Sequence, residues 1–172
     1  MKVTKKIRIN YTRFQHPNNK HKIYILNYLF IIMFVYNGYS QINKNGYNVF
    51  YYPNGEISSE GTLKNGQPDG YWKTYYESGV LKTEGKRKFF LLDSVWDFYH
   101  ENGNIHQKIT YKENKRSGDF LLFNNKGVLL ENTQFLLDKK NGKSIIYHLL
   151  DSGHRSFKAK EIMYENDLYE GL

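Results

Sequence analysis

The chain has 172 residues, with 25 Lys and Arg against 17 Asp and Glu, and it contains no cysteine. The lack of cysteine excludes a disulfide framework, thiol catalysis and lipid attachment through a cysteine. Residues 1–22 hold seven of the basic residues and no acid, so residues 41–172 carry a net charge of only about +1. The formal charge of +8 therefore does not indicate nucleic-acid binding.

The first 40 residues have the pattern of a secretory signal peptide. A basic segment precedes the apolar residues 23–36, and Gly38 and Ser40 stand three and one positions before Gln41. This order of basic, apolar and small residues predicts a signal helix that is cleaved before Gln41 and an exported protein, periplasmic or extracellular. The alternative is an uncleaved anchor, although a helix of 14 residues reaches only about 21 Å across a core of about 30 Å.

Residues 41–172 are predicted to form one domain of about five repeats. Glycines recur at a step of 24 residues, at Gly55, Gly79, Gly103 and Gly127. Aromatic residues keep the same step, at Tyr51, Tyr75, Tyr99, Phe123 and Tyr147. A fixed period in this range is typical of repeat architectures, in which each unit buries its apolar surface against its neighbours.

Each unit contains two short runs rich in aromatic and β-branched residues, separated by a glycine-bearing turn. Strong turn dipeptides occur at Asn54–Gly55, Asn65–Gly66, Asn102–Gly103 and Asn141–Gly142, because Asn and Gly tolerate positive φ. Short strands at this spacing predict an all-β fold, an elongated antiparallel meander of repeated β-hairpins. Residues 41–172 show no sustained helical period, so little helix is expected there.

Alternation along the strands predicts two different faces of the sheet. Residues i and i+2 share a face, so the five aromatic residues of the 24-residue series are expected to form a ladder across one face. The opposite face carries Trp72, Trp96 and Phe120 at equivalent positions. The end units have Asn48 and Ser144 there, which indicates less cover at the two ends of the array.

The unit over residues 70–85 reads G-x-W-x-x-Y-Y-x-x-G-x-L-x-x-E-G. This pattern resembles the variant MORN repeat of bacterial proteins often described as YwqK-type antitoxins, and the resemblance extends over about residues 46–170. It implies stacked β-hairpins and a binding role, and relatives in eukaryotes are associated with membranes and protein scaffolding. Ser94 departs from the pattern, because it stands where other units open with glycine.

No catalytic or cofactor-binding constellation is apparent in the sequence. Neither G-x-S-x-G nor H-E-x-x-H occurs, and a thin sheet offers no deep pocket, so the protein is expected not to be an enzyme and to need no cofactor. His100 and His106 flank one turn, and His148 and His154 repeat their spacing. A tight hairpin would place His106 opposite Phe98 and about 7–8 Å from His100, so each pair is either a metal site or two surface histidines.

One segment stands out as a candidate binding site, because apolar residues occupy a turn that is polar in other units. The segment comprises Lys86, Arg87, Lys88, Phe89, Phe90, Leu91 and Leu92. An apolar run at a turn is either a docking patch or packing against a neighbouring hairpin. We expect a repeat protein that mediates protein–protein or cell-envelope interactions.

Two other functions remain open from the sequence. The basic residues beside the apolar run favour binding to a phospholipid membrane surface, and the family resemblance allows an antitoxin or immunity role. Residues 169–172 resemble the start of a sixth unit, and an open strand edge there could pair with a second chain.

Overall fold

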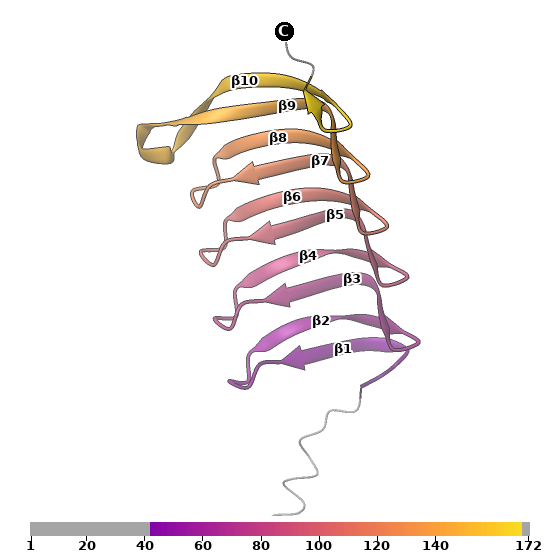
Figure 1. The fold of residues 1–172 in the computed structure, drawn as a ribbon. Helices are drawn as coiled ribbons and strands as arrows, with labels where there is room; N and C mark the ends of the chain where they lie inside the picture. Colours follow the sequence, from indigo (N-terminus) through magenta and orange to yellow (C-terminus); the bar gives the residue numbers. More distant parts are fainter. Residues whose placement is uncertain (1–41, 170–172) are drawn as a thin grey trace, which may run out of the picture. The chain divides into compact units, whose positions relative to one another are not determined.

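The computed structural model describes residues 42–169, and the predicted signal peptide lies outside this range. The described residues form one antiparallel sheet of 11 strands that follow one another in sequence order. Figure 1 shows the hairpins stacked one after another. The predicted all-β meander of repeated hairpins is confirmed. Within residues 42–169, no helix is long and apolar enough to cross a membrane.

The elements have the following bounds. The strands are β1 (Gly46–Tyr51), β2 (Ile57–Lys64), β3 (Gln67–Tyr75), β4 (Leu81–Lys88), β5 (Leu91–Tyr99), β6 (Ile105–Lys112), β7 (Lys115–Phe123), β8 (Leu129–Leu136), β9 (Lys139–Leu150), β10 (Arg155–Glu165) and β11 (Leu168–Tyr169). A single 3-10 turn, η1 (Asp151–Gly153), joins β9 to β10 and is the one helical element of the described part.

Wide turns join the two strands of each of the first four hairpins. In the first, Gly55 donates its N–H to the carbonyl of Tyr52 at 3.0 Å, and Tyr52 donates to the carbonyl of Glu56 at 2.8 Å. Gly55 has a φ of 91°, which fits a type I turn followed by a glycine bulge. The same pattern recurs at the other glycines of the series, Gly79, Gly103 and Gly127.

Tight turns of two residues link each hairpin to the next, and together they form what we call the tight-turn row. Its members are residues 65–66, 89–90, 113–114, 137–138 and 166–167, and both residues of every turn have positive φ. Such turns match the right-handed twist of the strands they join. The tight turns lie on one side of the sheet and the wide turns on the other (Figure 1).

The predicted turn at Asn141–Gly142 is wrong, because these residues lie inside β9. The chain turns four residues earlier, at Leu137–Asp138. Gly142 has a φ of 100° next to a register shift between β8 and β9. The glycine therefore accommodates a β-bulge within a strand and not a chain reversal.

One continuous row of facing residues crosses the sheet and contains most of the buried side chains. The row is Asn48, Gly61, Trp72, Gly85, Trp96, Ile109, Phe120, Thr133, Ser144 and Ile162. The indole of Trp72 covers Gly61, and a Cβ on that glycine would lie 2.5 Å from the ring. Trp96 covers Gly85 in the same way.

The polar residues that this row has in the predicted end units, Asn48 and Ser144, are covered, contrary to expectation. Ser144 is 1% exposed and Asn48 is 9% exposed. The Asn48 side chain donates to the carbonyls of Asn43 and Gly46, each at 2.8 Å. Ser144 shares a hydrogen bond with Thr133 at 2.5 Å. Buried polar groups are tolerated when they are paired in this way.

Side-chain hydrogen bonds tie the wide turns to the following repeat. Tyr52 donates to the carbonyl of Tyr75 at 2.6 Å, and Tyr76 donates to the carbonyl of Tyr99 at 2.7 Å. Asn124 continues the series with a bond of 2.8 Å to the carbonyl of Gly153. These contacts join residues 23 to 29 positions apart, so they hold neighbouring repeats in register.

Candidate binding surface on the tight-turn row

Two members of the tight-turn row carry exposed apolar side chains. Phe89 is 65% exposed and Phe90 46%, and two repeats further on Leu136 is 51% and Leu137 56% exposed. The φ angles of Phe89 and Phe90 are 49° and 59°. Bulky residues are rare in this left-handed region, which Asn and Gly adopt more readily. The Phe89–Phe90 turn is therefore strained, and strain of this kind is most often found at functional sites.

Most other tight turns are clasped to the preceding repeat by a pair of hydrogen bonds. Asn114 donates its N–H to the carbonyl of Leu92 at 2.9 Å, and its side-chain oxygen accepts the Leu92 N–H at 2.6 Å. Asp138 makes the same two bonds with Arg116, both at 3.0 Å. Asp167 clasps Lys140 at 2.9 and 2.7 Å.

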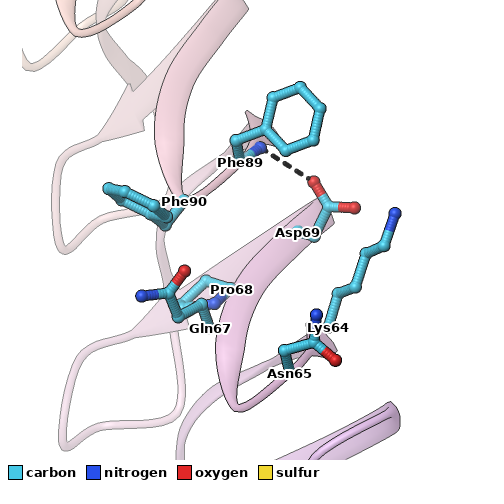
Figure 2. A pocket seen from close by; sticks show the side chains of 7 residues that line it. All are labelled: Lys64, Asn65, Gln67, Pro68, Asp69, Phe89 and Phe90. Carbon is cyan, nitrogen blue, oxygen red and sulfur yellow. Dashed lines mark hydrogen bonds between the residues drawn. The ribbon is translucent and has the colours of Figure 1, made fainter.

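The Phe89–Phe90 turn cannot form the side-chain half of this clasp. Phe90 has no side-chain acceptor, and Pro68, which stands where other repeats have Leu92 or Arg116, has no N–H to donate. The turn is held instead by a bond of 3.1 Å from the Phe89 N–H to the Asp69 carboxylate (Figure 2). The two departures match each other, because Pro68 has no N–H that would need the side-chain acceptor that Phe90 lacks.

A hollow lies between the first two tight turns. Its volume is about 150 Å³, and it is lined by Lys64, Asn65, Gln67, Pro68, Asp69, Phe89 and Phe90. Figure 2 shows Phe90 on the side of Gln67 and Pro68, whereas Phe89 extends on the side of Asp69. A second hollow of about 400 Å³ lies between the third and fourth turns, lined by Lys112, Glu113, Lys115, Ser117, Leu136 and Leu137. In both hollows the later turn supplies the apolar wall.

Lysine side chains surround these apolar residues. Exposed lysines stand directly before or after the first four tight turns, at Lys64, Lys88, Lys112, Lys115 and Lys139. The acids of the same turns are Glu113 and Asp138, and Asp69 lines the first hollow, so the lysines outnumber the acids. Asp138 pairs with Arg116 at 3.2 Å, and hydrogen bonds from Arg116 lower the pKa of its carboxyl. The rim of the surface is therefore basic around an apolar centre.

Only part of the predicted binding segment, residues 86–92, is exposed in the structure, and the other part packs against the sheet. The Arg87 guanidinium lies over the Trp96 ring, 5.3 Å from its centre, and donates to the carbonyl of Phe90 at 2.8 Å. Burial lowers the pKa of Arg87. Leu92 is half-buried and packs against the core cluster around Trp96, and Leu91 is half-buried at the start of β5.

Of that segment, the residues that remain exposed beside one another are Lys88, Phe89 and Phe90. Lys86 is also exposed, but its side chain points to the face opposite Arg87, because neighbouring residues of a strand alternate. Leu136 and Leu137 were not among the predicted residues. The repeat period could have revealed them, since Leu137 follows Phe89 by 48 residues, two full repeats.

The predicted geometry of the histidine pair is wrong. Phe98 faces Gln107 instead of His106, because the β5–β6 register shifts between Phe98 and Tyr99. The His100 and His106 rings therefore lie closer than expected, with centres 4.3 Å apart. Burial, and then His100, lower the pKa of His106.

The second histidine pair does not repeat this arrangement. His148 packs edge-on against Phe157, with ring centres 5.8 Å apart. Among residues 42–169, no group of three or more His, Asp or Glu side chains is placed to hold a metal ion. His100, His106 and His148 each pack against another ring.

Carboxylates on the face opposite the tryptophans are held by tyrosines of the predicted aromatic series. Tyr75 donates to Glu60 and Tyr99 donates to Glu84, each at 2.6 Å. Hydrogen bonds from Tyr47 and Tyr75 lower the pKa of Glu60, and the bond to Glu60 raises the pKa of Tyr47 to about 12. Each of these carboxylates accepts hydrogen bonds from two tyrosines, which favours its ionised form. Because the arrangement recurs in the next repeat, we assign it a structural role.

Comparison with known proteins gives one finding about the repeats. Three consecutive segments, residues 44–65, 68–89 and 92–113, match the MORN repeat variant. They cover β1 to β6, including the Phe89 position of the candidate surface. These three segments are similar to variant MORN repeats, which suggest a repeat protein, a class often involved in binding. No curated protein matches the sequence.

Proposed function

We propose that this protein is a non-enzymatic scaffold of the cell envelope that binds another protein through its tight-turn row. The observation that carries the proposal is the Phe89–Phe90 turn. Two exposed phenylalanines have positive φ at a position where Asn65–Gly66 shows that a strain-free pair fits the same fold. A left-handed conformation costs about 1–2 kcal/mol for each ordinary residue.

Exposure and strain together support binding over packing. Phe89 at 65% exposure contributes little to the core, so its side chain does not offset the cost of its backbone conformation. Contiguous exposed apolar residues with a polar rim mark interaction sites on protein surfaces. The predicted export signal places the partner outside the cytoplasm. An immunity role is the special case in which that partner is a toxin.

A membrane surface is the second candidate, and the basic rim around Phe89 and Phe90 favours it. Arg87 weakens this candidate, because its guanidinium is engaged with Trp96 and the carbonyl of Phe90. Only Lys88 of the basic triplet stands exposed beside the phenylalanines. Anionic membranes attract clusters of several basic residues next to apolar ones.

The proposal is tested by placing a photo-crosslinking amino acid at position 89 of the full chain in native cells. A matched control carries it at Asn102, an exposed wide-turn residue on the other side of the sheet. We expect a discrete protein adduct from position 89 and none from position 102. Adducts to lipid alone would favour the membrane candidate, and equal labelling from both positions would reject a specific surface.

A double substitution then links the surface to affinity. Phe89→Asn with Phe90→Gly copies the first tight turn, Asn65–Gly66, and removes both apolar side chains without destabilising the fold. We expect the purified partner to bind this variant at least tenfold more weakly, a loss of about 1.4 kcal/mol. Unchanged affinity would show that the phenylalanines are not the contact.

A further inference from the structure

We infer that the partner contributes an acidic amphipathic helix, which lies along the tight-turn row and anchors an apolar residue in each of the two hollows. This inference rests on the proposed protein-binding function and specifies the chemistry of the partner. The two hollows occupy equivalent places in the repeat, one beside Phe89–Phe90 and the other beside Leu136–Leu137.

The spacing of the hollows sets the length of the bound segment. Phe89 and Leu137 are two repeats apart, which is four strands of the sheet. At about 4.8 Å for each strand, the anchors are separated by ~19 Å. A helix rises 1.5 Å per residue, so about 13 residues cover this distance. Anchors on one helix face would therefore stand at positions i and i+11 or i+14.

The backbone of the tight-turn row favours a helix over an extended strand. An added strand needs an edge with unpaired N–H and C=O groups. Here the chain presents turns, and the N–H groups of Asn114 and Asp138 are already bonded to carbonyls of the preceding repeat. A bound segment must therefore satisfy its own backbone hydrogen bonds, as a helix does.

The charges of the rim select an acidic helix. Lys112 and Lys115 are exposed between the two anchors, with Glu113 between them, and Lys64, Lys88 and Lys139 stand around the hollows. Acidic residues beside the apolar stripe of the helix would face these lysines, whereas a basic helix would be repelled. Complementary charge of this kind speeds association and weakens with added salt.

The test maps where the partner touches the surface. The photo-crosslinking residue is placed at Phe89 or at Leu137 of the full chain in native cells, and the labelled partner residue is found by mass spectrometry. We expect both positions to label one partner, at residues 11–14 apart in an acidic segment. A synthetic peptide of that segment should bind the full chain as a helix by circular dichroism.

Variants and salt then test each part of the inference. Phe89→Asn and Leu137→Asn should each weaken peptide binding about tenfold, and raising the salt concentration should weaken it further, while Phe157→Asn, a change at an exposed phenylalanine of β10, should leave it unchanged. Labelled residues 5–7 apart, a basic segment or salt-independent binding would overturn the helix but keep protein binding. Adducts to lipid alone, or no adduct at either position, would overturn both.

Discussion

At the scale of single residues, two places in the buried row combine a tryptophan with a glycine that leaves room for its ring. Glycine lies beneath tryptophan at Gly61 and Gly85, and the next equivalent pair is Ile109 with Phe120. The pair after that, Thr133 and Ser144, is small and polar and closes with a hydrogen bond.

Gly85→Ala tests this size matching. The added methyl group would overlap the indole of Trp96, and overpacking of this kind lowers the free energy of unfolding by about 1–3 kcal/mol. In a Trp96→Phe background the same change should cost clearly less, because the smaller ring leaves room. Urea unfolding of the four proteins in this double-mutant cycle gives the interaction energy, and additive effects would contradict the contact.

The tyrosine–carboxylate bonds predict a pH dependence of stability. The hydrogen bond from Tyr99 lowers the pKa of Glu84 below 4.5, so folding favours the ionised carboxylate. This contribution is present at neutral pH and is lost as the pH falls through the lowered pKa. Tyr99→Phe should therefore destabilise the protein by about 1 kcal/mol at pH 7, with a smaller difference at pH 3. Urea unfolding at both pH values measures this, and a difference that grew in acid would contradict the assignment.

At the scale of the hairpin, sequence predicts turns well only where glycine marks the chain reversal. The wide turns at Gly55, Gly79 and Gly103 follow from the period and from dipeptides such as Asn102–Gly103. The Asn141–Gly142 dipeptide misleads, because a glycine with positive φ serves a bulge as readily as a turn. Bulges also shift the register by a residue, which is why the predicted partner of Phe98 was wrong.

We expect the protein to become more stable when the strained Phe89–Phe90 turn is replaced by residues that adopt positive φ readily. Phe89→Asn with Phe90→Gly replaces two strained residues by the pair found at Asn65–Gly66, and at about 1–2 kcal/mol for each residue this should raise the free energy of unfolding by about 2–4 kcal/mol. Urea unfolding of the full chain provides the measurement. Lower stability would mean that the phenylalanines pack in the fold, and it would remove the argument from strain.

At the scale of the whole sheet, each repeat contacts mainly the repeats beside it. The long-range side-chain bonds of the wide turns reach one repeat forward, as from Tyr52 to Tyr75, and the clasps of the tight turns reach one repeat back, as from Asn114 to Leu92. Stability in such arrays is close to a sum of local terms. The period in the sequence predicts this order and aligns Leu137 with Phe89, whereas the hollows themselves depend on side-chain positions that only the structure supplies.

Trp96→Ala should therefore have a local effect. Removing this buried ring, 3% exposed, should cost about 3–5 kcal/mol and lower amide protection most in β4, β5 and β6. Protection in β9 and β10 should fall less, as measured by hydrogen exchange with mass spectrometry. An equal loss along the whole sheet would show that the array unfolds as one cooperative unit.

Because Pro68 lacks an N–H, the residue at position 90 can vary in evolution more freely than the equivalent residues of other repeats. The side chains of Asn114 and Asp138 each accept a backbone N–H from the preceding repeat. Because Pro68 has no N–H, the residue at position 90 does not need a side-chain acceptor. Position 90 can then vary without disturbing a side-chain hydrogen bond of this kind, whereas Asn114, Asp138 and Asp167 keep theirs in their own turns. A residue other than proline at position 68 would present an N–H that needs an acceptor at position 90. We therefore expect the identities of residues 68 and 90 to change together in evolution.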